Sequence, residues 1–445
     1  MIRKYKEKGQ IIVILALGMV AILAITALAV DGSLLYNQRR NDQNTADSAA
    51  LAGAGKAAEK LKDYLPSDFS CGPGSTSLAR QASDLAVAEA VKSALDDGVL
   101  LDPYDLSNEN GVTVRCETDS EGMQFLDIHV MVTSEPETTF GRVISVNTLR
   151  TTTEAIARVY PNQPFAYGNA LVSLADTCKK NLGGVWFNGD STSFINKGGI
   201  FSNSCIDAGG SSIVDVVSGT VKAFQPGGCT GYVPAHTVTP IVPCEKADAK
   251  LPRGMIPPPV CSGVDRGGGS YTGTKTLYPG NYSGGITVKN GANITLSPGL
   301  YCISGGMTNH AKSRIYGKDV TLYFQDAGTV LFNQNDDTIG YGTELYAPSC
   351  NTSACGVPDA VQGLLMYFNP GSNNTVQLTG GSHNKYVGTI YGEEADFKFV
   401  GGAEIYTFNT QVIGRYIFVA GNAELRMDLN SKQWVQRPAS ISLIQ

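Results

Sequence analysis

The sequence is poor in the residues that most often build metal sites and nucleic-acid interfaces. Four histidines are scattered through 445 residues, and none of the ten cysteines belongs to a Cys-x-x-Cys pair, so the ligand spacing of a zinc site is missing. The net charge is −6, charged residues make up 17% of the chain, and no segment after the first nine residues concentrates Lys and Arg. We therefore expect no metal or other cofactor and no nucleic-acid partner.

Charge and proline are both missing near the start of the chain. Residues Gln10 to Val30 include no charged side chain, and at about 1.5 Å per residue they reach roughly the 30 Å of a bilayer's hydrocarbon core. No proline precedes Pro66, and the segment from Asp31 to Leu61 is rich in alanine and other helix formers. We predict one continuous helix whose first part is a membrane anchor. The anchor residues are Gln10, Ile11, Leu17, Val20, Leu23, Leu28 and Val30.

The first nine residues are basic, with four Lys and Arg side chains against Glu7. Basic residues beside a span stay in the cytoplasm, so the N-terminus is expected inside and the bulk of the chain outside. A buried soluble helix is disfavoured because the run has no polar face. A cleaved secretory signal is the other alternative, since Ala27-Leu28-Ala29 has the pattern of a cleavage site, although the apolar run is longer than most signal sequences.

A specific sequence pattern surrounds the anchor: KGQIIVILAL at its start and LAVDGSLLYNQRRNDQNTADSAALAGA at its end. This pattern resembles the N-terminal signature of TadE/TadG-like proteins of the tight-adherence (Tad, or Flp) pilus-assembly system. The matching residues are Gly9, Gln10, Asp31, Gly32, Tyr36, Arg39, Arg40, Asn44, Ala46, Asp47, Ala49, Ala50, Leu51, Ala52, Gly53 and Ala54. Family members that prepilin peptidase cuts usually have a Glu where this chain has Ile14. Cleavage after Gly9, cleavage near Ala29 and no cleavage therefore all stay open.

Small side chains form a stripe on the second half of the predicted helix. They recur at intervals of three and four residues, which lets another backbone approach closely. The stripe comprises Ala46, Ala49, Ala50, Gly53 and Ala57. It could pack against other pilin-like or Tad subunits, or against a second copy, or it could dock on the protein's own domain. Asp47 beside it could pair with Arg39 or Arg40 of a neighbour, or be solvated.

Residues 31–160 are expected to form a pilin-like α+β domain. A second helix is predicted at Leu78 to Leu101, where apolar residues recur at helical spacing. The pattern then alternates with period two, which predicts a small antiparallel sheet from strands at 112–115, 124–132, 145–152 and 155–159. The segment 138–159 also resembles the closing part of many TadE/TadG-like proteins.

The chain beyond Pro161 reads as short strands separated by Gly, Asn and Ser. LYPGNYSGG and LSPGLYCISGG repeat with an offset of nineteen, which is typical of a stack of short strands. We predict a right-handed β-helix, or solenoid, over 161–430, with a Pro-rich excursion at 239–260 and a tail at 431–445. A β-sandwich is the alternative. The segment also resembles the Gly-rich β-helical module often found after TadE/TadG-like anchors.

All ten cysteines follow residue 70, on the side expected to be exported, where disulfides persist. Their pairing cannot be deduced from sequence. The nearest-neighbour hypothesis is Cys71–Cys116, Cys178–Cys205, Cys229–Cys244, Cys261–Cys302 and Cys350–Cys355.

Clusters of carboxylates on a β-helix could support acid-base chemistry or weak calcium binding. The candidates are Asp336 with Asp337, and Glu393 with Glu394 and Asp396, but no basic partner, His or metal motif accompanies them in the sequence. Exposed tyrosines could also stack on sugars. The tyrosines in question are Tyr271, Tyr278, Tyr282, Tyr301, Tyr316 and Tyr323.

These patterns favour a non-enzymatic role in the bacterial cell envelope. We expect a Tad-type pilus-assembly or minor pilin-like protein, anchored by one span, that displays a β-helical module for assembly, adhesion or binding of a surface glycan or protein. The alternatives are the major subunit of an extracellular filament and a surface carbohydrate-active β-helix enzyme.

Overall fold

The computed structural model describes residues 10–62, 69–71, 77–107, 109–119, 123–180, 182–196, 198–217, 219–229, 242–333, 341–349, 357, 359–379, 384–401, 405–421, 424–428, 434–437 and 439–444. The chain divides into two compact units. Unit 1 consists of Met1–Gln163 and Pro438–Gln445, and unit 2 is Pro164–Arg437. Each is described by itself below.

Among the described residues of unit 1 are two α-helices. Helix α1 spans Gln10–Leu61 without a break, as predicted from the missing prolines. Helix α2, Leu78–Asp96, starts at the capping hydroxyl of Ser77 and is shorter than expected. It ends because Gly98 adopts φ +82°, and the amides of Gly98 and Val99 then bond back to Leu95 and Ala94.

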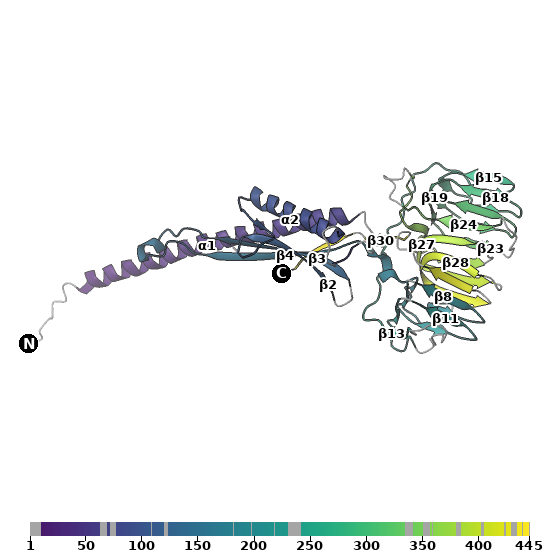
Figure 1. Cartoon of the computed structure of the whole chain (residues 1–445), viewed down its shortest axis with the longest axis horizontal. Helices are drawn as coiled ribbons and strands as arrows, with labels where there is room; N and C mark the ends of the chain where they lie inside the picture. The colour runs from purple at the N-terminus through teal and green to yellow at the C-terminus, as the bar shows by residue number, and fades with distance from the viewer. Residues whose placement is uncertain are drawn as a thin grey trace, which may run out of the picture. The chain divides into compact units, whose positions relative to one another are not determined.

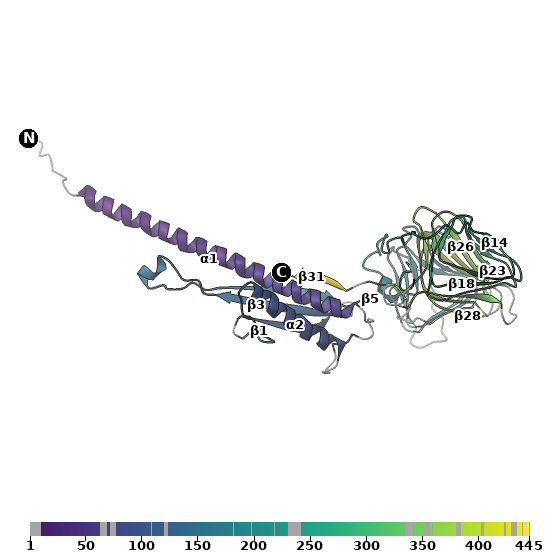
Figure 2. The same cartoon turned by 90° about the horizontal axis from the view of Figure 1, so that it is seen from above.

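The sheet of unit 1 has the strand order β1-β2-β3-β4-β31. Its strands are β1 (Asp102–Pro103), β2 (Gly111–Thr118), β3 (Gln124–Ser134), β4 (Thr151–Tyr160) and β31 (Ser440–Ile444). Strands β2, β3, β4 and β31 pair in antiparallel fashion, whereas β1 is parallel to β2. Figure 2 shows α1 and α2 beside this sheet, of which β31 is the last strand.

Two predictions for this unit are wrong. The strand predicted at 145–152 begins only at Thr151, as the start of β4. Residues 145–150 belong instead to a hairpin that carries the 3-10 helix η2, Gly141–Ile144, and the amides of Thr139 and Gly141 in this hairpin bond to a side chain of α1. The segment 431–445, predicted to be a tail, contains β30 (Gln436–Arg437) and β31. Strand β31 pairs with β4, which lies in the first half of the chain, and such a distant pairing leaves no local signal in the sequence.

The small-residue stripe of α1 is buried inside unit 1. Ala46, Ala49, Ala50 and Ala57 are fully buried in a core that α2 and the sheet complete. A Cβ added at Gly53 would lie 2.8 Å from the carbonyl oxygen of Ala86 in α2. The stripe therefore docks on the protein's own domain, and its interpretation as a surface for other subunits is wrong.

Two glycines of α1 should respond oppositely to alanine. Gly53→Ala forces α2 away, which costs about 1–3 kcal/mol and outweighs the helix propensity that alanine adds. We expect a net loss of about 1 kcal/mol in the free energy of unfolding of unit 1. At Gly55 an added Cβ meets nothing within 4 Å, so Gly55→Ala should stabilise by about 0.5–1 kcal/mol. Denaturant unfolding of the full chain in detergent, followed by helical circular dichroism, measures both. Equal changes in the free energy of unfolding for the two variants would contradict the close approach of Gly53 to α2.

Unit 2 consists of short strands, most of them three to five residues long. Its first strands are β5 (Gln163–Pro164), β6 (Leu171–Ser173), β7 (Gly184–Phe187), β8 (Thr192–Asn196), β9 (Ile200–Ser202), β10 (Ile206–Ala208), β11 (Ile213–Val216), β12 (Val221–Ala223) and β13 (Cys244–Lys246). The middle group is β14 (Gly269–Tyr271), β15 (Thr274–Leu277), β16 (Gly280–Tyr282), β17 (Ile286–Val288), β18 (Asn293–Leu296), β19 (Gly299–Ile303), β20 (Gly306–Asn309), β21 (Arg314–Gly317) and β22 (Val320–Phe324). The last group is β23 (Thr329–Asn333), β24 (Gly342–Tyr346), β25 (Leu364–Phe368), β26 (Thr375–Thr379), β27 (Lys385–Gly401), β28 (Ile405–Gly421) and β29 (Glu424–Asp428).

Apart from β5, which pairs with β30, these strands form three parallel ladders. One runs β15-β18-β21-β24-β27-β28-β29-β8-β11. The second runs β16-β19-β22-β25-β27-β28-β6-β9-β12-β13. The third runs β14-β17-β20-β23-β26-β27-β28-β7-β10. The sandwich alternative is wrong, because its strands would be antiparallel.

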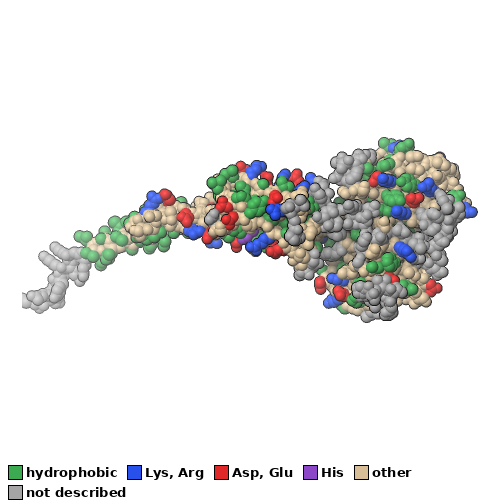
Figure 3. All heavy atoms as spheres, viewed as in Figure 1, with side chains coloured by type: hydrophobic (Ala, Val, Ile, Leu, Met, Phe, Trp, Pro, Cys, Tyr) green, Lys and Arg blue, Asp and Glu red, His purple; other side chains and the backbone are tan. Residues whose placement is uncertain are grey.

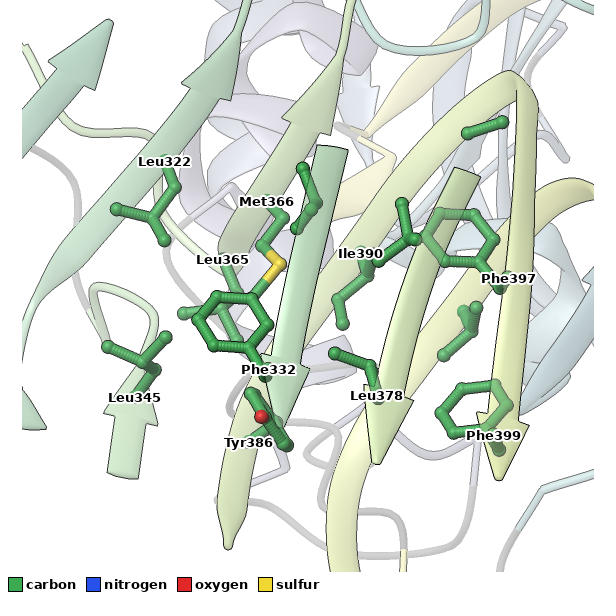
Figure 4. Close-up of a cluster of buried hydrophobic side chains, with 14 of the residues drawn as sticks. Leu322, Phe332, Leu345, Leu365, Met366, Leu378, Tyr386, Ile390, Phe397 and Phe399 are labelled. Atoms are coloured by element: carbon green, nitrogen blue, oxygen red, sulfur yellow. The ribbon is translucent and has the colours of Figure 1, made fainter. Parts of the chain in front are cut away.

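The repeat that the ladders define differs from the sequence repeat. Leu277 pairs with Leu296, as the offset of nineteen implies. Ile294, however, pairs with Ile315, and Ile286 with Met307, so the spacing between paired residues is slightly wider along most of the stack. Matching positions carry apolar side chains that stack from strand to strand. Figure 4 shows part of the resulting core, with Phe332, Leu378, Phe397 and Phe399 among its side chains.

The order of strands along the stack is not the order along the chain. Strand β28 pairs with β6 and β7, so the first strands of unit 2 stack on nearly the last ones. Figure 1 shows β15 at one end, β28 and β8 as neighbours, and β11 and β13 at the other end. The chain thus enters the stack in its middle, at β6, and builds toward the end that holds β13. It must then cross to the opposite end, where β14 lies.

Residues 247–265 make that crossing, and we call them the strap. It bonds in turn to β12 through Ala223, to Asn203 and to Glu393 of β27. It then reaches Tyr367 of β25 and is joined to β19 by the Cys261–Cys302 disulfide. The predicted excursion at 239–260 therefore lies on the strands in its described part, where Leu251 and Ile256 are buried in an outer core with Tyr367 and Tyr391.

Candidate functional site

The apolar half of α1 is exposed along its length. Leu17, Val20, Leu23, Leu28 and Val30 all present their side chains to the surroundings, and Gln10 and Ile11 belong to the first turn of the helix. Figure 3 shows this stretch as a rod of hydrophobic side chains. Among the described residues, α1 is the one helix long and apolar enough to cross a membrane. Such a surface fits a membrane-anchored protein.

The motif residues that follow the anchor divide between the surface and the core. Tyr36, Arg39, Arg40 and Asn44 are exposed, as is Gly32. Leu51 is also partly exposed, whereas Ala46, Ala50 and Gly53 are buried. Asp47 accepts a hydrogen bond of 2.8 Å from the amide of Gln43 on its own helix.

Asp31, the first residue after the apolar run, is buried and joins α1 to the hairpin between β3 and β4. Its carboxylate accepts the backbone N–H groups of Thr139 and Gly141 at 2.8 and 2.7 Å, and that of Phe140 at 3.2 Å. Burial alone would raise the pKa of Asp31. The three N–H donors together lower the pKa by more than burial raises it, so the pKa lies below its ordinary value. The carboxylate therefore stays charged and holds the hairpin.

Asp31→Asn should release the hairpin, because an amide cannot accept all three N–H groups as a charged carboxylate does. We expect faster hydrogen exchange at the amides of Phe140 and Gly141, measured by mass spectrometry in detergent. In the unsubstituted protein, the protection of these amides relative to an unstructured peptide at the same pH should likewise fall as the pH drops through the lowered pKa of Asp31, since protonation removes the charge. Asp47→Asn is the matched control and should leave these amides protected. Unchanged exchange in Asp31→Asn would contradict the assignment.

The carboxylates predicted as a catalytic or calcium cluster each have a structural partner. Glu393 is buried and accepts the N–H of Gly254 and the hydroxyl of Tyr391. Glu394 accepts the N–H of Gly371. Asp396 forms a bidentate ion pair with Arg415 at 2.8 Å for both bonds, which raises the pKa of that guanidinium. The expectation that these carboxylates lack a basic partner is wrong for Asp396. Asp336 and Asp337 lie outside the described residues.

The described part of the chain offers no cluster of metal ligands. No three His, Cys, Asp or Glu side chains among the described residues are placed to hold a metal ion. A groove of about 350 Å³ lies on the third ladder. Its lining is Ala327, Gly328, Thr329, Val330, Leu331, Asn373, Thr375 and Gln377, with no carboxylate.

Three of the tyrosines proposed as sugar platforms are buried. Tyr282 and Tyr301 stack with ring centroids 5.8 Å apart, and Tyr323 packs edge-on against Tyr367. Tyr278 is exposed, and Tyr271 and Tyr316 are half-buried. Burial raises the pKa of Tyr282 and of Tyr367 to about 12. Most of this tyrosine content therefore serves packing.

Unit 2 should lose stability in alkali because of these buried phenols. Tyr282 loses its proton near pH 10 when unfolded but near 12 when folded, so its contribution is complete below pH 10 and declines as the pH rises to 12. We expect a loss of about 2 kcal/mol per such tyrosine over that window. Tyr282→Phe should flatten the pH dependence, and Phe at the exposed Tyr278 should not. Tryptophan fluorescence across a pH series measures it; equal slopes in all three proteins would contradict the burial argument.

Four of the five proposed disulfides are present: Cys71–Cys116, Cys178–Cys205, Cys229–Cys244 and Cys261–Cys302. The fifth proposed pair, Cys350 and Cys355, lies outside the described residues. No described cysteine is free. Disulfides on both units fit an oxidising compartment.

Some buried polar residues that form long-range hydrogen bonds within unit 1 or within unit 2 are not predicted from the sequence. Asp42 is buried and accepts hydrogen bonds from Gln38 and Ser134. Gln411 is fully buried and donates to the carbonyl oxygens of Phe165 and Asn169. Polar residues inside a helix or strand pattern usually face solvent, so only their long-range partners identify them.

Comparison with known proteins finds a match for the N-terminal part of the chain. No curated protein and no solved structure matches it. A family model does match, described as Tad, Flp pilus-assembly TadE/G-like, over residues 9–57. This range covers the exposed apolar half of α1, Asp31 and the buried stripe, and it confirms the resemblance inferred from the motif. The chain therefore carries a TadE/G-like Flp pilus-assembly domain at its N-terminal end, which associates it with the Tad pilus.

Proposed function

We propose that this protein is a membrane-anchored component of Tad (Flp) pilus assembly, of the minor pilin-like kind, in the bacterial cell envelope. The observation that carries the proposal is the coincidence of two findings: the TadE/G-like match at residues 9–57 includes the one described helix that could span a membrane. The N-terminus stays in the cytoplasm, because basic residues precede the span, and the rest of the chain is exported.

Unit 2 is, in this proposal, a three-sided β-helix displayed outside the cell for assembly, adhesion or binding. Three parallel ladders with a regular spacing between paired strands support the β-helix, since each set of three strands contributes one side chain layer to a common core. The strap and the disulfide at Cys261 support a rigid display module, because they tie many layers together.

A role as an enzyme is not proposed. Glu393 and Glu394 accept hydrogen bonds from backbone amides, and Asp396 is paired with Arg415. The polar side chains that line the groove on the third ladder carry hydroxyl and amide groups. A major filament subunit is also not favoured, because the small-residue stripe of α1, which could have packed in a filament core, is already used inside unit 1.

The test is to delete the gene in a host that makes Flp pili and to complement it with variants. We expect fewer pili on the deletion strain, recovery with the unsubstituted chain, and no recovery with Leu17→Lys/Leu23→Lys, which places two charges in the anchor. Leu100→Lys, at an exposed position outside the anchor, is the matched control and should restore pili.

Mass spectrometry of sheared filaments and of membranes completes the test. We expect the chain mainly in the membrane fraction, and its first residue will show whether it begins at Met1, Gln10 or Val30. A wild-type number of pili on the deletion strain would overturn the proposal. Recovery of the chain as the most abundant filament protein would instead make it a major subunit.

A further inference from the structure

The hairpin between β3 and β4 exposes a compact apolar tip. We call residues 138–148 the tip. Val143 is 84% and Ile144 76% exposed, and Phe140 and Val146 are also exposed. Neighbouring large apolar side chains on one exposed loop usually mark a surface that contacts a partner or a membrane.

The tip is held in this form by its own hydrogen bonds. Thr138 pairs with Asn147 through the backbone at 2.9 Å, and its hydroxyl donates to the carbonyl oxygen of Val146 at 2.5 Å. The amide of Val146 donates to Gly141, where an added Cβ would lie 2.9 Å from the oxygen of Val146. These bonds within the tip, together with those from Asp31, fix the turn with Val143 and Ile144 on its outside.

Asp31 fixes where the tip lies along α1. Its carboxylate holds the amides of Thr139, Phe140 and Gly141, and it directly follows Val30, the last residue of the apolar run. Figure 2 shows the hairpin extending beside α1 toward the apolar half of that helix. The tip is therefore placed at the level where the helix would leave the hydrocarbon core of a bilayer.

We propose that the tip inserts Val143 and Ile144 into the interface of the same bilayer that α1 spans, which gives unit 1 a second, peripheral membrane contact. This inference rests on the proposed anchoring by α1. The contact would fix the rotation and tilt of α1 relative to the membrane, because Asp31 couples the two elements. Arg142, ion-paired with Glu137 and half-exposed, can reach lipid phosphates from the same turn.

A lipid surface fits the tip better than a second copy of the chain. A stable protein interface buries roughly 800 Å² on each partner, more than four side chains supply. Interfacial insertion needs only a few apolar side chains when an adjacent span already holds the protein at the membrane. The exposed apolar side chains of the tip are tied through Asp31 to the point where the exposed apolar side chains of α1 end, at Val30.

The experiment places an environment-sensitive NBD probe on single added cysteines in the full-length chain. Ile144→Cys reports on the tip, Leu17→Cys on the anchor, and Leu100→Cys on an exposed site away from both. Each protein is reconstituted into phosphatidylcholine vesicles with or without lipids brominated in the upper acyl chain. The chain without an added cysteine gives the labelling background, and circular dichroism checks the fold.

We expect bromolipids to quench the probes at positions 17 and 144 by roughly twofold or more and to leave position 100 unchanged, as for groups at the acyl boundary. Quenching at 17 without quenching at 144 would overturn the inference and leave the anchor intact. An absence of quenching at positions 17 and 144 alike would overturn both this inference and the proposed membrane anchoring by α1. A probe at 144 that is shielded from aqueous iodide but unaffected by bromolipid would show that protein, such as a second copy, covers the tip, which also overturns the inference.

Discussion

Asn203→Ala is expected to lower the free energy of unfolding of unit 2 by about 3 kcal/mol. The side chain of Asn203 is 3% exposed and bonds both backbone groups of Leu251 in the strap, each at 2.8 Å. Alanine would leave a buried N–H and a buried C=O without partners, and each such loss costs about 1–3 kcal/mol. Because Leu251 belongs to the outer core, water cannot easily replace the lost amide.

Tryptophan fluorescence during denaturation measures this change in the intact chain. The sequence has two tryptophans, Trp186 and Trp434, and both lie in unit 2, so the signal is specific to that unit. Asn290→Ala, at an exposed turn position, is the matched control and should shift the free energy by less than about 0.5 kcal/mol. If the two variants behaved alike, the strap would not be stabilised through Asn203.

The importance of the strap follows from the order of strands. A stack built in chain order needs only short connections, whereas this chain must cross the stack from β13 at one end to β14 at the other. The crossing places a segment against side chains that would otherwise be exposed on the second ladder, among them Tyr367 and Tyr391. The Pro-rich sequence that predicted an excursion thus supplies a covering layer.

The sequence predicts best what depends on local pattern. The unbroken α1 follows from uninterrupted apolar and alanine-rich residues, and many strands of unit 2, such as Val320–Phe324 and Ile286–Val288, follow from short β-branched and aromatic runs. The end of α2 is predicted too late, although Gly98 provides the left-handed residue that stops it. In the sequence pattern that signal is outweighed by the apolar residues that continue to Leu101.

Features set by distant partners could not be predicted. A short strand such as β6, near the start of unit 2, pairs with β28 near its end, and nothing local selects that partner over the next strand in sequence. The same holds for β31 on β4 and for Arg415 on Asp396. The alternating residues at 145–152 predict a strand, but residues 145–150 belong to the hairpin, whose turn is held by bonds to the distant carboxylate of Asp31.

Removing the Cys261–Cys302 disulfide should have the largest effect on unit 2. It closes a loop of 41 residues, for which the chain-entropy relation gives about 4 kcal/mol of stabilisation. Cys261→Ala/Cys302→Ala is the suitable variant, because Cys302 is buried and serine would add an unpaired hydroxyl there. The matched control, Cys229→Ala/Cys244→Ala, opens a 15-residue loop worth about 3 kcal/mol in the same relation.

Global stability alone would separate these two variants poorly, so local opening is the decisive measurement. The Cys261–Cys302 bridge fastens the strap to β19. On one side of the bridge Tyr367 bonds to the carbonyl oxygen of Ile256, and on the other side Asn281 bonds to the carbonyl oxygens of Gly263 and Val264. Without the bridge, hydrogen exchange should accelerate at the bonded amides on either side of it, those of Met255, Arg266 and Asn281, whereas the control variant should leave these amides protected. Equal protection in both variants would show that the outer core alone holds the strap, and that the bridge acts only by restricting the unfolded chain.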